Sequence, residues 1–113
     1  MGYKNAAQFD NLRIAAFGSI TSSYVQLGSS LSTPAVELVF KNGTDSVIFV
    51  STDGVNDKKF YPAGWAEAVD VRTNAPESSD LLFQVGTSFF IKFVGSAPTS
   101  GSFGIEVLQQ IVS

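Results

Sequence analysis

The feature that most constrains the fold is an alternation of apolar and polar residues that recurs between turn residues, about every 8 to 12 positions. Successive side chains of a β-strand point to opposite faces, so an alternating segment has one buried face and one wet face. Val36, Leu38 and Phe40 fall on one such face, and the charged Glu37 and Lys41 fall on the other. The recurrence of this pattern predicts an all-β fold, either a sandwich or a barrel.

The alternating segments and the short apolar runs together predict seven to nine short strands. They cover residues 12–17, 23–27, 36–41, 46–51, 67–73, 81–85, 87–94 and 102–112. Segment 46–51 is apolar on both faces, which predicts a central or doubly covered strand. The plain loop composition of 95–101 predicts that the last two strands pair as a hairpin. No long amphipathic helix and no internal repeat is visible, and the polar loop 74–80 is expected to be exposed.

A length of 113 residues fits one domain, since single cores typically serve about 50 to 200 residues. We therefore expect one antiparallel β-sandwich domain over residues 1–113. Residues 1–10 alternate poorly, so we expect an extended N-terminal arm there, or one helical turn over residues 5–9. The first residues lack the apolar core of a signal peptide, and no apolar run approaches the roughly 20 residues that span a bilayer. We expect a protein that is soluble or held in an assembly.

The chain contains no cysteine and no histidine. A disulfide framework, a thiolate metal site, a catalytic cysteine and the usual serine triad are therefore excluded. Carboxylate pairs such as Glu67 with Asp70, or Glu37 with Glu106, remain as the general acid and base of a hydrolase. Most acidic residues lie in turns or on the polar side of strands, where a solvated surface is the simpler interpretation. We expect no enzyme and no cofactor.

The densest acidic loop, residues 53–57, contains carboxylate and amide oxygens of the kind that bind Ca²⁺. It lacks the alternate-position ligands and the distal Glu of an EF-hand, and turn chemistry accounts for its composition without a metal. The net charge is −3, and the seven basic residues are scattered along the chain. Nucleic-acid binding depends on clustered Lys and Arg, so no nucleic-acid partner is expected. Lys58 and Lys59 are expected at a solvated strand end or turn.

Several aromatic residues lie next to chain breaks, where they could form a platform for a sugar or a protein. Trp65 has a second interpretation as a cap on the core, because Trp is highly buried on average. Tyr3 and Phe9 lie on a segment without a pattern of its own, and a neighbouring subunit is a plausible partner for them. The candidate interface residues are Tyr3, Phe9, Leu12, Tyr24, Tyr61 and Trp65.

Turn signatures recur in a fixed order along most of the chain. They lie in residues 3–6, 9–13, 16–20, 33–35, 41–45, 49–57 and 62–64, and end in the strand that begins at 101–102. In kind and order they resemble small virion proteins of tailed bacteriophages, several of which are capsid cement or stapling (decoration) proteins. The resemblance implies a jelly-roll-like sandwich that binds the outside of an icosahedral shell and locks neighbouring subunits together. No binding-site motif carries over residue by residue.

This resemblance makes the major capsid protein the expected partner, with self-association at a symmetry axis and no membrane contact. The expected location is the capsid exterior, after synthesis in the host cytoplasm. An acidic protein is unsuited to the DNA-facing side of a shell, which agrees with that location. Two alternatives stay open: a head–tail adaptor or tail component of the same virion, and a carbohydrate-binding module that uses Tyr24, Tyr61 or Trp65.

Overall fold

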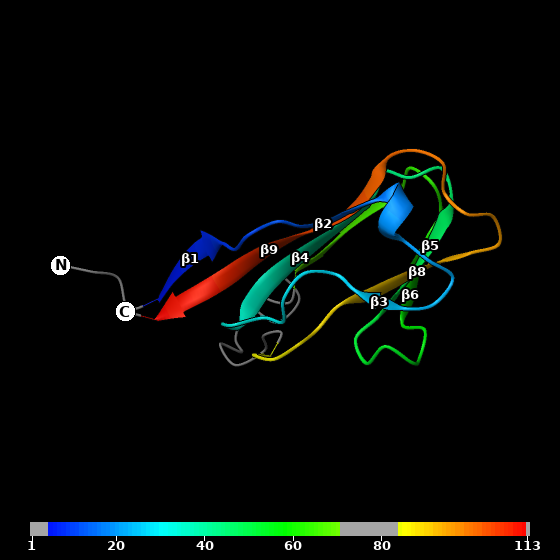
Figure 1. The fold of residues 1–113 in the computed structure, drawn as a ribbon. Helices are drawn as coiled ribbons and strands as arrows, with labels where there is room; N and C mark the ends of the chain where they lie inside the picture. Colours follow the sequence, from blue (N-terminus) through cyan, green and yellow to red (C-terminus); the bar gives the residue numbers. More distant parts are fainter. Residues whose placement is uncertain (1–4, 71–83, 113) are drawn as a thin grey trace.

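The computed structural model describes residues 5–70 and 84–112, and the side chains of residues 8–70 and 84–109 (Figure 1). In chain order the elements are β1 (Asn5–Phe9), β2 (Arg13–Ala16), the 3-10 turn η1 (Phe17–Ser19), β3 (Val25–Gln26), β4 (Ala35–Asn42), β5 (Val47–Ser51), β6 (Lys59–Tyr61), β7 (Ala66–Asp70), β8 (Phe90–Val94) and β9 (Ser102–Val112). Within these residues no helix has the length and apolar character needed to cross a membrane.

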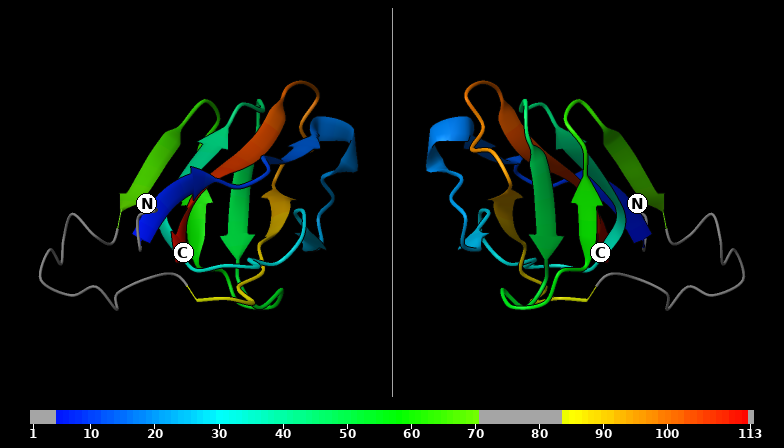
Figure 2. Two further views of the ribbon diagram at one scale, coloured as in Figure 1. Left: turned by 90° about the vertical axis from the view of Figure 1, so that its left-hand side faces the viewer. Right: turned by 90° about the vertical axis from the view of Figure 1, so that its right-hand side faces the viewer.

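The strands form two antiparallel sheets that lie as two layers (Figure 2). The first sheet has the order β1-β9-β4-β7, with β2 also paired to β9, and the second sheet has the order β3-β8-β5-β6. From β2 onward the chain changes sheet at every connection except the one between β5 and β6. This exchange between a five-stranded and a four-stranded layer is the topology of a jelly roll, so the expected all-β, jelly-roll-like sandwich is confirmed.

One expectation about pairing is wrong, and of the two alternatives for residues 5–9 the extended one holds. The strands expected to form a hairpin, β8 and β9, lie in different sheets, and residues 95–101 cross from one layer to the other. The composition of a loop shows where the chain turns. Which strands pair with each other depends on residues that are far apart in the sequence. Residues 5–9 form no helical turn: they are extended and pair with β9, with Gln8 opposite Gln109 and Phe9 opposite Leu108.

Other expectations hold or are only partly testable. Strand β5 lies between β8 and β6, which confirms the central strand expected over residues 46–51. In the expected strand 81–85, residues 81–83 lie outside the described residues, and Val85 and Gly86 form a turn. The loop 74–80 also lies outside the described residues.

The core fills the space between the sheets. Phe103, Ile105 and Val107 alternate along β9, and each is at most 1% exposed. The buried apolar residues are Ile20, Leu27, Leu31, Ala35, Leu38, Phe40, Ile48, Val50, Tyr61, Phe89, Ile91, Phe103, Ile105 and Val107. Phe40 of the first sheet stacks on Tyr61 of the second, with ring centroids 5.4 Å apart. Contacts across the layers therefore hold the two sheets together.

A buried polar cluster forms the corner where the chain leaves β4 for the second sheet. The side chain of Asn42 is 2% exposed, and its amide donates to the carbonyls of Ser46 at 2.8 Å, Tyr61 at 2.8 Å and Pro62 at 3.1 Å. Its Oδ1 accepts from the N–H of Thr44 at 3.0 Å and from the Thr44 hydroxyl at 2.7 Å. One side chain thus connects the end of β4, the start of β5 and the end of β6.

We expect Asn42→Ala to lower the free energy of unfolding by about 3 kcal/mol or more, because it leaves buried donors and acceptors without partners. Chemical denaturation measures this loss. Ser22→Ala, an exposed change without such bonds, serves as the control and should stay within about 0.5 kcal/mol of the parent. A loss below about 1 kcal/mol for Asn42→Ala would show that the corner does not depend on this amide.

Candidate functional site

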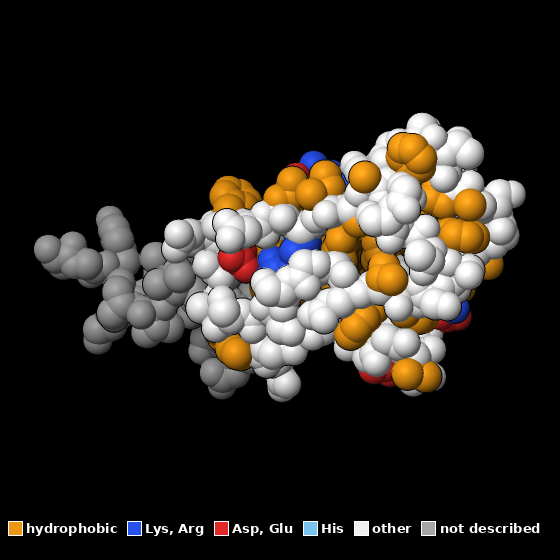
Figure 3. All heavy atoms as spheres, in the orientation of Figure 1, with side chains coloured by type: hydrophobic (Ala, Val, Ile, Leu, Met, Phe, Trp, Pro, Cys, Tyr) orange, Lys and Arg blue, Asp and Glu red, His pale blue; other side chains and the backbone are white. Residues whose placement is uncertain are grey.

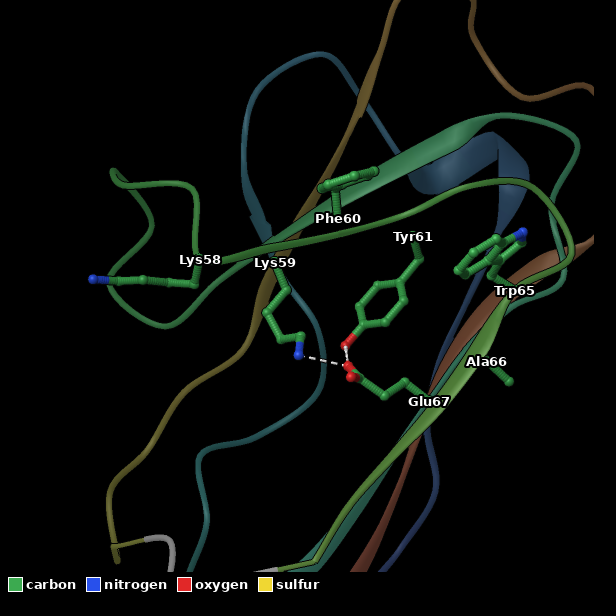
Figure 4. Close-up of a pocket in the computed structure, with 7 residues that line it drawn as sticks. All are labelled: Lys58, Lys59, Phe60, Tyr61, Trp65, Ala66 and Glu67. Carbon is green, nitrogen blue, oxygen red and sulfur yellow. Dashed lines mark hydrogen bonds and ion pairs between the residues drawn. The ribbon is translucent and has the colours of Figure 1, made fainter.

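The candidate site is a groove of about 500 Å³ between β6 and β7. These strands end the two sheets on the same side of the sandwich, so the groove lies along an edge where both layers stop. The residues that line this aromatic groove are Lys58, Lys59, Phe60, Tyr61, Trp65, Ala66 and Glu67 (Figure 4).

Two large aromatic side chains in the groove are exposed. Trp65 is 63% exposed and Phe60 is 62% exposed. In Figure 4, Phe60 and Tyr61 leave β6 on opposite sides, as neighbouring residues of a strand do. Aromatic side chains are enriched at protein interfaces and are frequent binding anchors, so their exposure here makes the groove a candidate contact surface.

A tight turn sets the position of Trp65. The N–H of Trp65 donates to the carbonyl of Pro62 at 3.1 Å, and Gly64 has a φ of 79°, which suits the third position of a type II turn. The backbone of Asn42 fixes this turn from below, because its carbonyl accepts from Gly64 at 2.9 Å and its N–H donates to Trp65 at 2.8 Å. The buried corner therefore holds the exposed ring in place.

A small charged cluster forms one wall of the groove. Glu67 accepts a hydrogen bond from the Tyr61 hydroxyl at 2.9 Å and pairs with the Lys59 ammonium at 2.6 Å. The hydrogen bonds from Lys59 and then Tyr61 lower the pKa of Glu67. Burial, and then the bond to Glu67, raise the pKa of Tyr61. At neutral pH the carboxylate is thus charged and engaged, which gives the wall a fixed shape.

The structure separates the aromatic residues that the sequence suggested as one platform. Tyr61 faces the opposite layer and packs in the core. Its side chain is only 3% exposed, so it is not part of an exposed platform. The Tyr24 hydroxyl donates to Asp57, and Lys92 lies 4.6 Å above its ring, which ties Tyr24 to the β5–β6 loop. That loop and Trp65 lie at opposite ends of β6.

The remaining candidate interface residues lie on another face. Phe9 is 73% exposed and Leu12 is 55% exposed, both in or beside the strands paired with β9, and Tyr3 lies outside the described residues. Sequence reasoning missed Phe60, the second exposed ring of the groove. The signal was the period of two in β6: Lys59 and Tyr61 share one face, so Phe60 points to the other.

The acidic loop between β5 and β6 is held by its own carboxylate. Asp53 accepts from the N–H groups of Val55 and Asn56, both at 2.8 Å, and from the Ser51 hydroxyl at 2.7 Å. The N–H groups of Asn56 and then Val55 hold the pKa of Asp53 well below its usual range. Among the described residues, no three acidic side chains gather in a group that could hold a metal ion.

Of the carboxylate pairs considered for hydrolysis, Glu67 with Asp70 is separated, whereas Glu37 and Glu106 share the outer face of the first sheet, where they lie opposite Leu108 and Val39. Glu67 and Asp70 are three positions apart in β7, so they point to opposite faces. Glu106 lies on the outer face of the first sheet and binds Lys41 at 2.8 Å. No protein-family model and no curated protein matches this chain.

The Asp53 loop gives a pH-dependent contribution to stability. A carboxyl whose pKa is lower in the folded state stabilises fully above its unfolded pKa of about 3.9, and this stabilisation is lost as the pH falls further. We expect Asp53→Ala to have a lower Tm than the parent at pH 7, and the difference to shrink between about pH 4 and pH 2. Thermal melts across this range measure it.

Thr52→Ala, a neighbouring change that removes no carboxylate, serves as the matched control. Its difference from the parent in Tm should not follow the same pH profile. A difference for Asp53→Ala that stays constant from pH 7 to pH 2 would contradict the role given to the charged carboxylate.

Proposed function

We propose that this protein is a virion decoration protein that binds the outer surface of a phage capsid and staples neighbouring capsid subunits. The observation that carries the proposal is the aromatic groove, in which Trp65 and Phe60 are each more than 60% exposed on a rigid edge. Fully burying a large aromatic side chain removes about 150 to 250 Å² from water. Trp65 is therefore the strongest anchor for a protein partner in the groove, and Phe60 adds exposed apolar area on the other side of β6.

The rim of the groove suits a protein surface better than a free charged ligand. Lys59 and Glu67 neutralise each other at 2.6 Å, so the wall adds hydrogen-bonding groups at little net charge. A central aromatic cluster with a polar rim is the common anatomy of a protein interface. The occupant proposed for the groove is a segment of the major capsid protein that places apolar side chains against Trp65.

The assignment to a capsid is supported by three features together. The turn signatures resemble those of small phage virion proteins, the fold is a jelly roll, and the net charge of −3 opposes contact with packaged DNA. On this proposal the protein is made in the host cytoplasm and acts on the capsid exterior. It works as a binding protein without catalysis, and stabilises the shell because it binds only the assembled state.

The direct test is sedimentation of the purified protein with capsids assembled from the major capsid protein of the same phage. We expect Trp65→Ala to weaken binding at least about 30-fold, the loss expected for an interface anchor worth about 2 kcal/mol. Val55→Ala, a change at a 76% exposed residue in the β5–β6 loop, is the matched control and should bind like the parent.

Three outcomes would count against the proposal. Absence of binding to assembled capsids, combined with binding to isolated head–tail or tail components, would favour the adaptor alternative. Binding of the parent to a glycan array that is lost in Trp65→Ala, without binding to capsids, would favour a carbohydrate-binding module. Equal capsid binding by the parent and by Trp65→Ala would remove the groove from the contact.

A further inference from the structure

Asn42 and Gly43 form the one Asn–Gly pair in the sequence. In such a pair, the backbone nitrogen of the glycine can attack the side-chain carbonyl carbon of the asparagine. Glycine makes this attack easiest, because no Cβ shields its nitrogen and its backbone rotates freely. Of all the asparagines in this chain, Asn42 therefore has the neighbour that most favours loss of its side-chain amide.

The fold requires both residues of this pair. The Asn42 amide donates to three backbone carbonyls, which neither an alanine nor an aspartate side chain can do. At Gly43, a Cβ would lie 2.9 Å from the Ser102 carbonyl oxygen, a distance at which the backbone would have to shift. The geometry of the corner thus brings a chemically labile pair into the fold.

The folded corner keeps the two reacting atoms apart. Asn42 ends β4 and has an extended backbone, which directs the next nitrogen away from the Asn42 side chain. The Gly43 N–H donates to the Ser102 carbonyl at 2.8 Å, so the proton that must leave before the attack is held in a hydrogen bond. The Asn42 side chain is fixed as well, through the bonds of its amide and of its Oδ1. Ring closure therefore requires the corner to open.

The loop 95–101 covers the corner from outside. The N–H of Thr99 donates to the Asp45 carboxylate at 2.8 Å. The backbone of Gly101 lies against that of Gly43, since a Cβ on Gly101 would come within 2.0 Å of the Gly43 carbonyl oxygen. An opening has to break contacts between two loops as well as the bonds inside the corner, so it is a rare event.

The product of the reaction does not fit the closed corner. A carboxylate at position 42 has no N–H to donate, and three carbonyl oxygens would face it where the side chain is 2% exposed. Lys41 does not supply a compensating charge, because it lies on the outer face and pairs with Glu106 at 2.8 Å. Figure 3 shows mostly uncharged atoms at the end of the sandwich where β9 begins. A chain that has reacted therefore cannot rebuild the corner.

We propose that Asn42–Gly43 is a deamidation site that the folded corner keeps closed, and that loss of the Asn42 amide disables the corner irreversibly. In the open corner, the Gly43 N–H gives its proton to a base in the solvent, and its nitrogen bonds to Cγ of Asn42. The bond from Cγ to Nδ2 breaks, and the amide group takes up a proton and leaves as ammonia. One water molecule then opens the ring at either carbonyl, which leaves an aspartate or an isoaspartate at position 42.

The modification reaches the aromatic groove through the backbone of Asn42. The Asn42 carbonyl accepts from Gly64 at 2.9 Å and its N–H donates to Trp65 at 2.8 Å, so the turn that carries the indole depends on this residue. An isoaspartate routes the backbone through the former side chain and displaces both groups. Opening of the corner therefore sets how long the groove keeps its shape, whatever partner the groove binds.

Incubation of the full chain at mildly alkaline pH, followed by digestion and mass spectrometry, tests the site. We expect deamidation at Asn42 to be at least about 100-fold slower in native buffer than in urea, because only the open fraction reacts. In urea, Asn42 should react faster than Asn11 and Asn56, which precede larger residues. Equal rates at Asn42 in buffer and in urea would overturn the proposal, and so would a rate in urea no faster than that of Asn11.

Thr44→Val separates the closed corner from the chemistry of the pair. It removes the hydroxyl that donates to Asn42 Oδ1 at 2.7 Å and keeps the shape of the side chain. We expect deamidation to become about tenfold faster in buffer, the effect of one lost hydrogen bond, and to be unchanged in urea. Thr52→Val, the same change at an exposed residue, is the matched control and should alter neither rate. An unchanged rate in buffer for Thr44→Val would contradict the proposal.

Asn42→Asp tests the second half of the proposal, because it introduces one of the two products directly. We expect its urea midpoint to lie below that of Asn42→Ala, since alanine removes the bonds without adding a buried charge. A variant that does not fold in buffer would agree with this expectation, whereas a urea midpoint equal to that of the parent would refute it. None of these measurements uses capsids, so they hold or fail independently of the decoration role.

Discussion

Most of the structure depends on the alternation of β9. This strand pairs with β1, β2 and β4, and its inward residues Phe103, Ile105 and Val107 are almost fully buried. Burial of each such side chain contributes about 1.5 to 3 kcal/mol. Because the period of a strand is two, a slip by one residue would expose all three at once. The same register directs Gly104 and Glu106 to the outer face of the first sheet.

The second constraint is the polar corner around Asn42. Its side chain connects three strands, and its backbone holds the turn that carries Trp65. The position of the exposed ring thus depends on buried hydrogen bonds more than on packing of the ring itself. The Trp65 indole is exposed, so a partner that covers it would remove apolar area from water. Because the backbone turn that carries Trp65 is already held in place, this binding would cost little conformational entropy.

The sequence predicts the strands and the sandwich because period-two alternation is a local property, visible in neighbouring residues of one sequence. The partner of each strand is not local. The loop 95–101 contains turn residues, and nothing in it specifies that β8 and β9 enter different layers. The aromatic residues show the same limit: alternation in β6 separates Phe60 from Tyr61, but three residues alone do not show which of the two faces the core, so Tyr61 was expected at the surface.

The sequence predicted that the candidate site would be a binding surface, but it identified only some of the residues of that site. Because the chain has no histidine and no cysteine, the sequence favours a binding surface over a catalytic site. The Pro62–Gly64 turn correctly marks Trp65 as a residue next to a chain break. The surroundings of the glycines were not predictable, because the sequence cannot tell a glycine with neighbouring atoms against its Cα from one beside open space. That distinction needs the atoms around a hypothetical Cβ.

The central claim is that this jelly roll acts by covering apolar surfaces with neighbouring proteins on the outside of a shell. A cryo-electron microscopy reconstruction of the virion tests it most directly. We expect density for the sandwich on the outer capsid surface, in copies that follow the shell symmetry, with the β6–β7 edge against capsid subunits. Density for a dozen copies or fewer at the head–tail vertex, or an aromatic groove open to solvent in the complete particle, would contradict it.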